Sequence, residues 1–317
     1  MIGRLAPSPT GAQHLGNART FLIAWLLARQ SRSSLWLRIE DLETPRVKSW
    51  ATQQAIEDLQ WLGLDWDGNI LIGFDKDYVL QTERMERYQQ ILVELQAREL
   101  VYPCTCTRSQ IESISAAPHE SSLDGPVYPG TCSTKSVHDA DELIAKKVPF
   151  AWRFRIPSQA MELVDQFAGR QSILDLRKQL GDFVVARANG AIAYQLAVVV
   201  DDHEMDVEQV VRGDDLLIST FRQLVLYAAL NWSPPQFCHL PLVIGTDGRR
   251  LAKRHGDTRL SAFREAGIQP ESIIGMLAYR SGLLDQNQPI TAKELLGGDP
   301  LTKLSHDPIV VDSSRLF

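Results

Sequence analysis

The chain has 317 residues, of which 44% are hydrophobic and 23% are charged, and its formal net charge is −6. These values are ordinary for a globular protein of one large or two modest domains, and the acidic balance argues against a protein that coats nucleic acid, though not against an RNA enzyme with a local basic face. No apolar run approaches the roughly 20 residues that span a bilayer, and four cysteines without a secretory signal point to a reducing compartment such as the cytoplasm.

The first hundred residues predict strands that alternate with helices. From the spacing of their apolar residues, we expect strands at 2–7 and 35–41, and helices at 15–29, 47–62 and 82–99. Connections of this length join parallel strands by right-handed crossovers, so the pattern predicts an α/β fold with a parallel sheet.

From residue 101 to residue 187 this pattern is interrupted. Residues 104–133 are rich in Ser, Pro and Gly and have no periodicity, which is typical of loops. Strands of a smaller subdomain are expected at 151–157 and 182–187. The sequence therefore predicts a loop-dominated insertion within one α/β domain.

The α/β pattern returns at residues 193–213. A helix is expected at 217–230, a buried strand at 237–245, and mainly helix beyond residue 256. The tail after Asp299 lacks a long periodic pattern, so we expect partial order there at best.

His14-Leu15-Gly16-Asn17 lies between the first strand and an amphipathic helix. His14 can donate to a phosphate oxygen, Gly16 leaves room for an adenine or a ribose, and a helix amino terminus favours an anion. Taken alone, these four residues fit a helix-capping turn better than a nucleotide site.

A basic loop, residues 244–256, follows the last predicted strand and carries Arg249, Arg250, Lys253 and Arg254. Such a loop can neutralise a triphosphate as charge develops in a phosphoryl-transfer transition state. Alone it is most often a solvated surface loop. The two motifs in this order within an α/β chain are far more specific than either one.

Five stretches together resemble the glutamyl-tRNA synthetase family of class I aminoacyl-tRNA synthetases: RLAPSPTG…HLGN, RIEDLETPR, AYQLAVVVDD, VVRGDDL and RLAKRHG. HLGN corresponds to the family's HIGH motif and RLAKR to its KMSKS loop. The resemblance implies a Rossmann-like catalytic domain in two halves, 1–100 and 188–256, a connective insertion at 101–187, and a helical stem-contact-like region with a tail at 257–317. Full-length family members continue with a helical anticodon-binding region, which we do not expect here.

The resemblance also implies a role for each matched residue. L-Glutamate would be bound by Arg4, Ala6, Pro7, Ser8, Glu40, Tyr194 and Arg212. ATP, accompanied by Mg²⁺, would be bound by His14, Gly16, Asn17, Arg250 and Lys253, with His14 and Lys253 serving catalysis. A substrate with two carboxylates and one ammonium does need cationic donors and an acidic partner. Glu40 and Arg212 could instead form a structural ion pair, and Tyr194 could be a core residue.

Three cysteines of the insertion suggest a metal site. Cys104 and Cys106 form a C-x-C pair, and Tyr128 and Cys132 follow as Y-x3-C, so three thiolates and a phenolate could close a tetrahedral zinc site. This order resembles the structural zinc site of short members of the family. The cysteines could also be reduced and unliganded, and His119 is a competing fourth ligand.

Two further groups of residues favour structural roles. Cys238 is expected to be a buried core cysteine. Asp201-Asp202-His203 ends an apolar run, where carboxylates commonly pair with a neighbouring basic residue, so we expect a structural role there rather than a metal or acid–base role.

The short members of the family that the chain resembles attach glutamate to the modified base queuosine in the anticodon of tRNA(Asp). The resemblance therefore implies ATP, L-glutamate and tRNA(Asp) carrying queuosine as partners, with no membrane and with a monomer as the default. One alternative is a truncated synthetase that charges the 3′ end of tRNA(Glu). Another is a non-catalytic tRNA-binding paralogue, suggested by Arg250 and Ala252, which replace the first lysine and the serine of KMSKS.

Overall fold

The computed structural model describes residues 1–42, 47–68, 76–115, 126–249, 251 and 257–312. The expected roles of Arg250 and Lys253, the substitution at Ala252, and the competing ligand His119 all lie outside these residues. None of the described helices combines the length and the apolar character needed to span a membrane.

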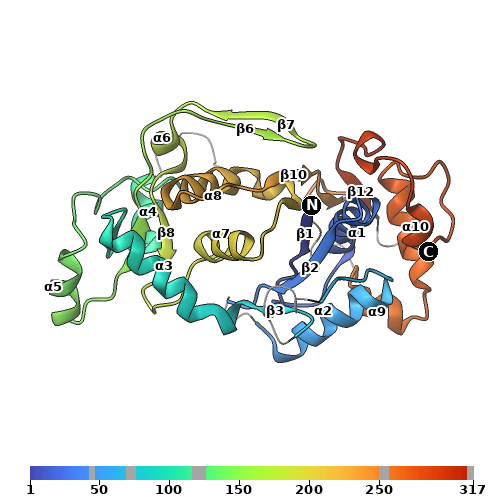
Figure 1. The fold of residues 1–317 in the computed structure, drawn as a ribbon, viewed down its shortest axis with the longest axis horizontal. Helices are drawn as coiled ribbons and strands as arrows, with labels where there is room; N and C mark the ends of the chain where they lie inside the picture. Colours follow the sequence, from blue (N-terminus) through green and yellow to red (C-terminus); the bar gives the residue numbers. More distant parts are fainter. Residues whose placement is uncertain (43–46, 69–75, 116–125, 250, 252–256, 313–317) are drawn as a thin grey trace.

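A five-stranded parallel sheet lies at the centre of the molecule, as the alternating pattern predicts (Figure 1). Its order is β10-β9-β1-β2-β3. The strands are β1 (Ile2–Leu5), β2 (Ser34–Ile39), β3 (Val79–Leu80), β9 (Gln209–Gly213) and β10 (Gln236–Leu240). Every pair within this sheet is parallel, and the register places Arg4 opposite Trp36 and Arg212 opposite His239.

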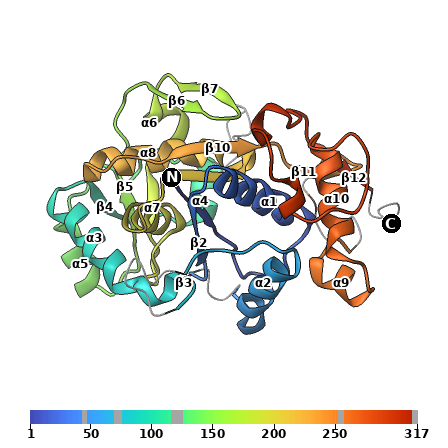
Figure 2. The same ribbon diagram turned by 45° about the vertical axis from the view of Figure 1, so that its right-hand side comes forward.

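Helices cover both faces of this sheet (Figure 2). On one face, α1 (Leu15–Gln30) packs with Leu35, Leu37 and Ile39 of β2 in one apolar cluster; on the other, Trp36 packs with α7 (Tyr194–Glu204) and α8 (Leu217–Leu230) in a second. Successive residues of a strand point to opposite faces, and both faces are buried, which explains the nearly continuous apolar run of β2. Near this sheet also lie α2 (Ser49–Trp61) and α3 (Met85–Ala97), with a 3₁₀ turn η2 (Gln81–Arg84) before α3 and η3 (Asp214–Leu216) before α8.

The insertion contains more regular structure than the sequence predicts. The expected strands are present as β5 (Ala151–Phe154) and β8 (Phe183–Ala186), and they form an antiparallel sheet with β4 (Val101–Cys104). A separate hairpin, β6 (Met161–Asp165) and β7 (Gly169–Ile173), and the short helices α4 (Arg108–Ser115), α5 (Asp139–Ala145) and α6 (Leu176–Leu180) were not expected. The expectation of a loop-dominated insertion is therefore wrong for the described residues. These elements were missed because a helix or strand of four to eight residues is too short to give a clear periodicity.

The carboxy-terminal part corrects two expectations. The single strand expected at 237–245 is interrupted at Pro241, which has no backbone N–H to continue a ladder. β10 therefore ends at Leu240, and β11 (Val243–Gly245) pairs with β12 (Ile309–Val311) in another sheet. The tail through Val311 is thus ordered by a strand pairing that it forms with a distant segment. α9 (Leu260–Glu265) and α10 (Pro270–Arg280) precede it, with 3₁₀ turns η5 (Lys293–Leu295) and η6 (Pro300–Thr302).

Asp58 of α2 is buried against α9, and its substitution should stabilise the protein in a pH-dependent way. Both of its carboxylate oxygens lack a hydrogen-bond partner among the described residues. The NH2 atom of Arg264 lies 3.6 Å from Asp58 Oδ1. Burial raises the pKa of Asp58 to about 6, against the attraction of Arg264. A carboxyl group whose pKa is higher in the folded chain lowers stability as it ionises, so this loss grows between about pH 4 and pH 6 and is constant above.

We therefore expect Asp58→Asn to raise the free energy of unfolding by about 1–3 kcal/mol at pH 8 and to change it little at about pH 3. Urea unfolding at the two pH values measures this difference. Glu94→Gln, at an exposed position of α3, is the control and should have little effect at either pH. An equal effect of Asp58→Asn at both pH values would contradict the assignment.

Candidate active site

A cavity of about 560 Å³ opens where the parallel strands end. The segments that follow β1, β2, β9 and β10 all contribute to its wall, and the carboxyl edge of a parallel sheet is where α/β proteins bind ligands. Ten of the residues that the sequence singled out line this cavity: Arg4, Ala6, Pro7, Ser8, His14, Gly16, Asn17, Glu40, Tyr194 and Arg212.

His14 caps the first helix and also faces the cavity. The Nδ1 of its ring accepts a hydrogen bond from the backbone N–H of Gly16 at 3.0 Å. The backbone N–H of His14 donates to Oδ1 of Asn17 at 3.2 Å. These two bonds form a capping box at the start of α1. A side chain at Gly16 would begin 2.9 Å from the imidazole Cε1, so only glycine leaves the ring in this position.

The described residues on both sides of 252–256 form backbone hydrogen bonds with β11 or with the turn that contains His14. Leu251 donates its backbone N–H to Val243 O at 3.4 Å, and Val243 lines the cavity. On the other side, the backbone N–H of Leu15 donates to Thr258 O at 3.1 Å, and that of Leu260 donates to Gln13 O at 2.9 Å. The His14 turn is therefore joined by backbone hydrogen bonds to the residues that directly follow the basic loop, about 240 positions later in the sequence.

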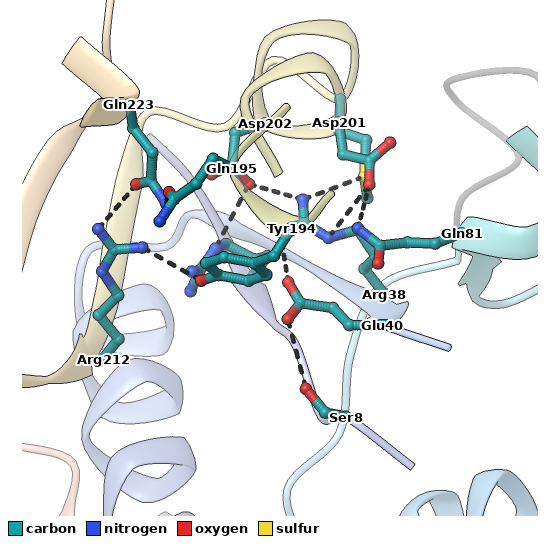
Figure 3. A network of polar contacts seen from close by, with 12 residues as sticks. Ser8, Arg38, Glu40, Gln81, Tyr194, Gln195, Asp201, Asp202, Arg212 and Gln223 are labelled. Atoms are coloured by element: carbon teal, nitrogen blue, oxygen red, sulfur yellow. Dashed lines mark hydrogen bonds and ion pairs between the residues drawn. The ribbon is translucent and has the colours of Figure 1, made fainter. Parts of the chain in front are cut away.

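Arg38 is the centre of a buried ion network beneath the cavity (Figure 3). Its guanidinium donates to Asp202 Oδ1 at 2.6 Å and to Glu40 Oε1 at 3.0 Å, and it lies 3.7 Å from Asp201 Oδ2. The side chain is fully buried. Burial alone would lower the pKa of Arg38, but the three carboxylates outweigh burial and raise it well above its usual value. Arg38 therefore remains charged and holds three acidic groups in place.

Arg4 and Glu40 belong to this network and also line the cavity. Arg4 Nε lies 3.5 Å from Asp202 Oδ1, and burial lowers the pKa of Arg4 against the attraction of Asp202. Burial likewise raises the pKa of Glu40, against the attraction of Arg38 and Arg4. Ser8 Oγ donates to Glu40 Oε2 at 3.5 Å, so the first turn of the chain also contacts this carboxylate.

Arg212 of β9 is a buried cation whose hydrogen-bond partners among the described residues are uncharged. Its guanidinium donates to His239 Nε2 and Thr220 Oγ1. It also donates to Gln223 Oε1 and, at 3.4 Å, to Tyr194 OH (Figure 3). Because a buried cation is most stable beside an anion, this arrangement is suited to a carboxylate or phosphate ligand that enters the cavity.

The three cysteines of the insertion converge on Tyr128. The Sγ atoms of Cys104, Cys106 and Cys132 all lie within 4.8 Å of one another, and Tyr128 OH lies 3.4 Å from Cys104 Sγ and 3.8 Å from Cys106 Sγ. The pKa of Cys132 is lowered to about 7, because hydrogen bonds from its surroundings outweigh the effect of burial. This cluster could hold a metal ion.

The structure supports the structural interpretation of Asp201 and Asp202. Asp201 accepts hydrogen bonds from Gln81, Arg84 and Tyr88, and Asp202 accepts one from Arg38. Cys238 is fully buried, as expected.

Several residues of the site were missed by the sequence analysis: Arg38, Gln81, Gln195, Thr220, Gln223 and His239. For Arg38 and His239 a signal exists, since each is a polar residue with apolar residues on both sides in its strand.

Comparisons with known proteins give concordant matches. Residues 1–316 match the family described as tRNA synthetases class I (E and Q), catalytic domain. The Glutamyl-Q tRNA(Asp) synthetase of Rhodopirellula baltica is 52% identical over 305 residues, which are 93% of this chain and 89% of the relative. The protein of the same name from Symbiobacterium thermophilum is 45% identical over 316 residues, 100% of this chain and 97% of the relative.

A solved structure gives the same fold. The crystal structure of a glutamate tRNA ligase from Elizabethkingia meningosepticum, in complex with its amino acid, matches with a TM-score of 0.83 and 28% identity. The match covers 100% of this chain and 68% of that chain.

Removing the Arg38 guanidinium should destabilise the fold strongly. Arg38→Met leaves Asp201, Asp202 and Glu40 close together without their shared cation, and a broken buried ion network costs about 3–5 kcal/mol. Urea unfolding measures this loss. Arg98→Met, which removes an exposed partner of Glu94 on α3, is the matched control and should change stability by no more than about 0.5 kcal/mol. Equal losses for both variants would show that the network does not stabilise the fold.

Proposed function

This chain belongs to the class I tRNA synthetases of the glutamate and glutamine branch, and we propose on that basis that it activates L-glutamate with ATP and transfers it to queuosine in the anticodon of tRNA(Asp). Relatives named for this reaction match almost the full length of both chains at 45–52% identity. In the structure, the observation that carries the proposal is one cavity that presents both the Arg212 guanidinium and the Glu40 carboxylate.

Glutamate fits the charges of this cavity. The buried Arg212 guanidinium would bind one carboxylate, with Tyr194 OH beside it, and Arg4 would bind the other. Glu40 would pair with the ammonium group. Ala6, Pro7 and Ser8, which follow β1, would form the adjoining wall. A neutral side chain in place of the second carboxylate would leave a buried cation without an anion, which gives a physical basis for selecting glutamate.

ATP would bind at the amino terminus of α1. Since Nδ1 of His14 accepts the Gly16 N–H, the neutral ring carries its proton on Nε2, from which it can donate to a phosphate oxygen. The amino terminus of the helix, near Asn17, adds positive potential through the helix dipole. We assign Arg250 and Lys253 to the phosphates and retain His14 and Lys253 as the catalytic groups. Mg²⁺ would accompany the triphosphate.

The reaction then needs no side-chain nucleophile. An oxygen of the glutamate α-carboxylate attacks the α-phosphorus of ATP, pyrophosphate leaves, and glutamyl-adenylate forms. A hydroxyl of the queuosine cyclopentenediol next attacks the activated carbonyl, an ester bond forms, and AMP leaves. The protein contributes positioning and charge neutralisation. In this scheme residues 1–100 and 188–256 form the catalytic domain, 101–187 the insertion that approaches the RNA, and 257–317 a stem-contact-like region.

The cysteine cluster would hold structural zinc through Cys104, Cys106, Tyr128 and Cys132. Two zinc-bound thiolates are about 3.8 Å apart in a tetrahedral site with bonds of about 2.3 Å. The Sγ atoms of Cys106 and Cys132 are 3.6 Å apart, which fits that geometry. Four protein ligands leave no open position, so zinc would stabilise the insertion and take no part in adenylate formation.

Transfer of labelled glutamate to tRNA tests the proposed function. We expect label on tRNA(Asp) isolated from cells that make queuosine and none on tRNA from matched cells that cannot make it. Equal label on both pools, within tRNA(Glu), would overturn the proposal in favour of a conventional synthetase. Absence of glutamate-dependent ATP–pyrophosphate exchange would instead indicate a paralogue that only binds RNA.

Removal of the metal should separate the two steps of the reaction. In Cys106→Ser we expect zinc content to fall from one equivalent to well below it, and transfer to tRNA to fall about tenfold or more, because the insertion loses a cross-link. ATP–pyrophosphate exchange should fall less than threefold. Elemental analysis and the two assays measure these values, and Cys238→Ser, which alters a cysteine outside the cluster, is the control for zinc content. Full zinc content in Cys106→Ser would contradict the ligand assignment.

A further inference from the structure

A chain of buried hydrogen bonds runs from the cavity to the insertion. Arg212 Nε lies 3.0 Å from His239 Nε2, and His239 Nδ1 lies 2.6 Å from Asp165 Oδ2. The side chains of His239 and Asp165 are both fully buried. Arg212 and His239 are register partners on β9 and β10, whereas Asp165 is the last residue of β6, in the hairpin of the insertion.

The contacts of Asp165 define its charge. Its Oδ1 accepts the backbone N–H groups of Phe167, Ala168 and His239 at 2.8–3.0 Å. Although burial raises the pKa of this carboxyl, hydrogen bonds from His239 and from these amides outweigh burial and lower it. Asp165 is therefore an anion, and its Oδ2 accepts the hydrogen on Nδ1 of His239.

This proton position makes His239 an acceptor on its other side. A neutral imidazole carries one hydrogen, so Nε2 has a free electron pair for the Nε–H of Arg212. Burial lowers the pKa of His239 and Arg212 lowers it further, against the opposite pull of Asp165. Thr220 Oγ1 also lies 3.0 Å from His239 Nε2. A hydrogen on Nε2 could be donated to this oxygen, but it would leave the Nε–H of Arg212 without an acceptor among the described residues.

The remaining contacts of Arg212 show why its orientation matters. One terminal nitrogen, NH2, is occupied by Thr220 at 2.7 Å and Gln223 at 2.8 Å. The other, NH1, has only Tyr194 OH at 3.4 Å as a partner among the described residues, and both Arg212 and Tyr194 line the cavity. The protein thus fixes Nε and NH2 from behind and leaves NH1 to a ligand.

We propose that Asp165 and His239 are positioning residues for substrate binding. Asp165 sets the tautomer of His239, and His239 in this tautomer holds Arg212 with its NH1 toward the glutamate carboxylate. This inference rests on the proposed function, because it takes the Arg212 ligand to be glutamate. It gives the hairpin of β6 and β7 a role at the catalytic sheet. The hairpin lies over β10 (Figure 2), and the backbone N–H of Gln166 donates to Phe237 O at 2.8 Å.

Asp165→Asn tests the proposal, because the asparagine amide can donate to Nδ1 and move the imidazole hydrogen to Nε2. In ATP–pyrophosphate exchange we expect the KM for glutamate to rise at least about tenfold, while the KM for ATP changes less than twofold. The control is Asp175→Asn, in the same insertion, which keeps a good N-cap for α6 and should leave both constants unchanged. An unchanged KM for glutamate in Asp165→Asn, or an equal rise in both KM values, would overturn the proposal.

A second variant separates tautomer control from mere packing. His239→Gln places an amide oxygen near the position of Nε2, where it accepts from Arg212 whatever residue 165 is. In the H239Q background, Asp165→Asn should therefore raise the KM for glutamate less than twofold further. A full tenfold rise in that background as well would show that Asp165 acts on packing and would overturn the positioning role.

Nitrogen-15 NMR of histidine-labelled protein tests the tautomer without any assay of activity. We expect His239, identified by the signals that disappear in H239Q, to carry its hydrogen on Nδ1 in the unmodified chain and on Nε2 in Asp165→Asn. A hydrogen on Nε2 in the unmodified chain would overturn the inference. If the NMR result holds and glutamate-dependent exchange is absent, the proposed function fails and the tautomer assignment stands.

Discussion

The buried guanidinium of Arg38 is the interaction on which the rest of the site depends. It lies on the face of β2 that packs against α7. Three carboxylates surround it, one from Glu40, directly after β2, and two from α7. Such a cluster is stable only when every charge has a partner, because unpaired charges in an apolar interior are very costly. The ion network therefore fixes how α7 sits on the sheet. Tyr194, the first residue of α7, is placed in the cavity by the same constraint.

The two arginines that face the cavity are held in different ways. Arg4 shares Asp202 with Arg38, so its charge is largely balanced by the protein. Arg212 has only neutral direct partners among the described residues, and the Asp165 carboxylate is connected to it only through His239. One cavity therefore contains a balanced cation, Arg4, which lies beside a carboxylate of the protein, and an unbalanced one, Arg212, which does not. For a substrate with two carboxylates, the unbalanced site contributes the greater share of binding energy, since its guanidinium gains an anion that the empty site lacks.

The sequence predicted the architecture better than the environment of the site. Most strands and helices around the parallel sheet followed from apolar spacing, although β3 did not, and most of the residues assigned by motif line one cavity. Contacts such as Arg212 with His239 and His239 with Asp165 link residues 27 and 74 positions apart, and no local pattern encodes them. The order of the tail was missed for the same reason, because β12 forms only by pairing with β11, more than 60 residues earlier.

His14 shows that a capping role and a binding role need not be alternatives. The cap uses Nδ1 of the ring, and this bond leaves the hydrogen on Nε2. The interaction that starts α1 therefore also determines what the ring can donate. The adjoining Leu15 N–H, which the cap does not use, donates to Thr258 O. One turn thus begins a helix, orients an imidazole and attaches the chain that follows the basic loop. A substitution at Gly16 would disturb all three, because the first atom of any side chain would meet the imidazole at 2.9 Å.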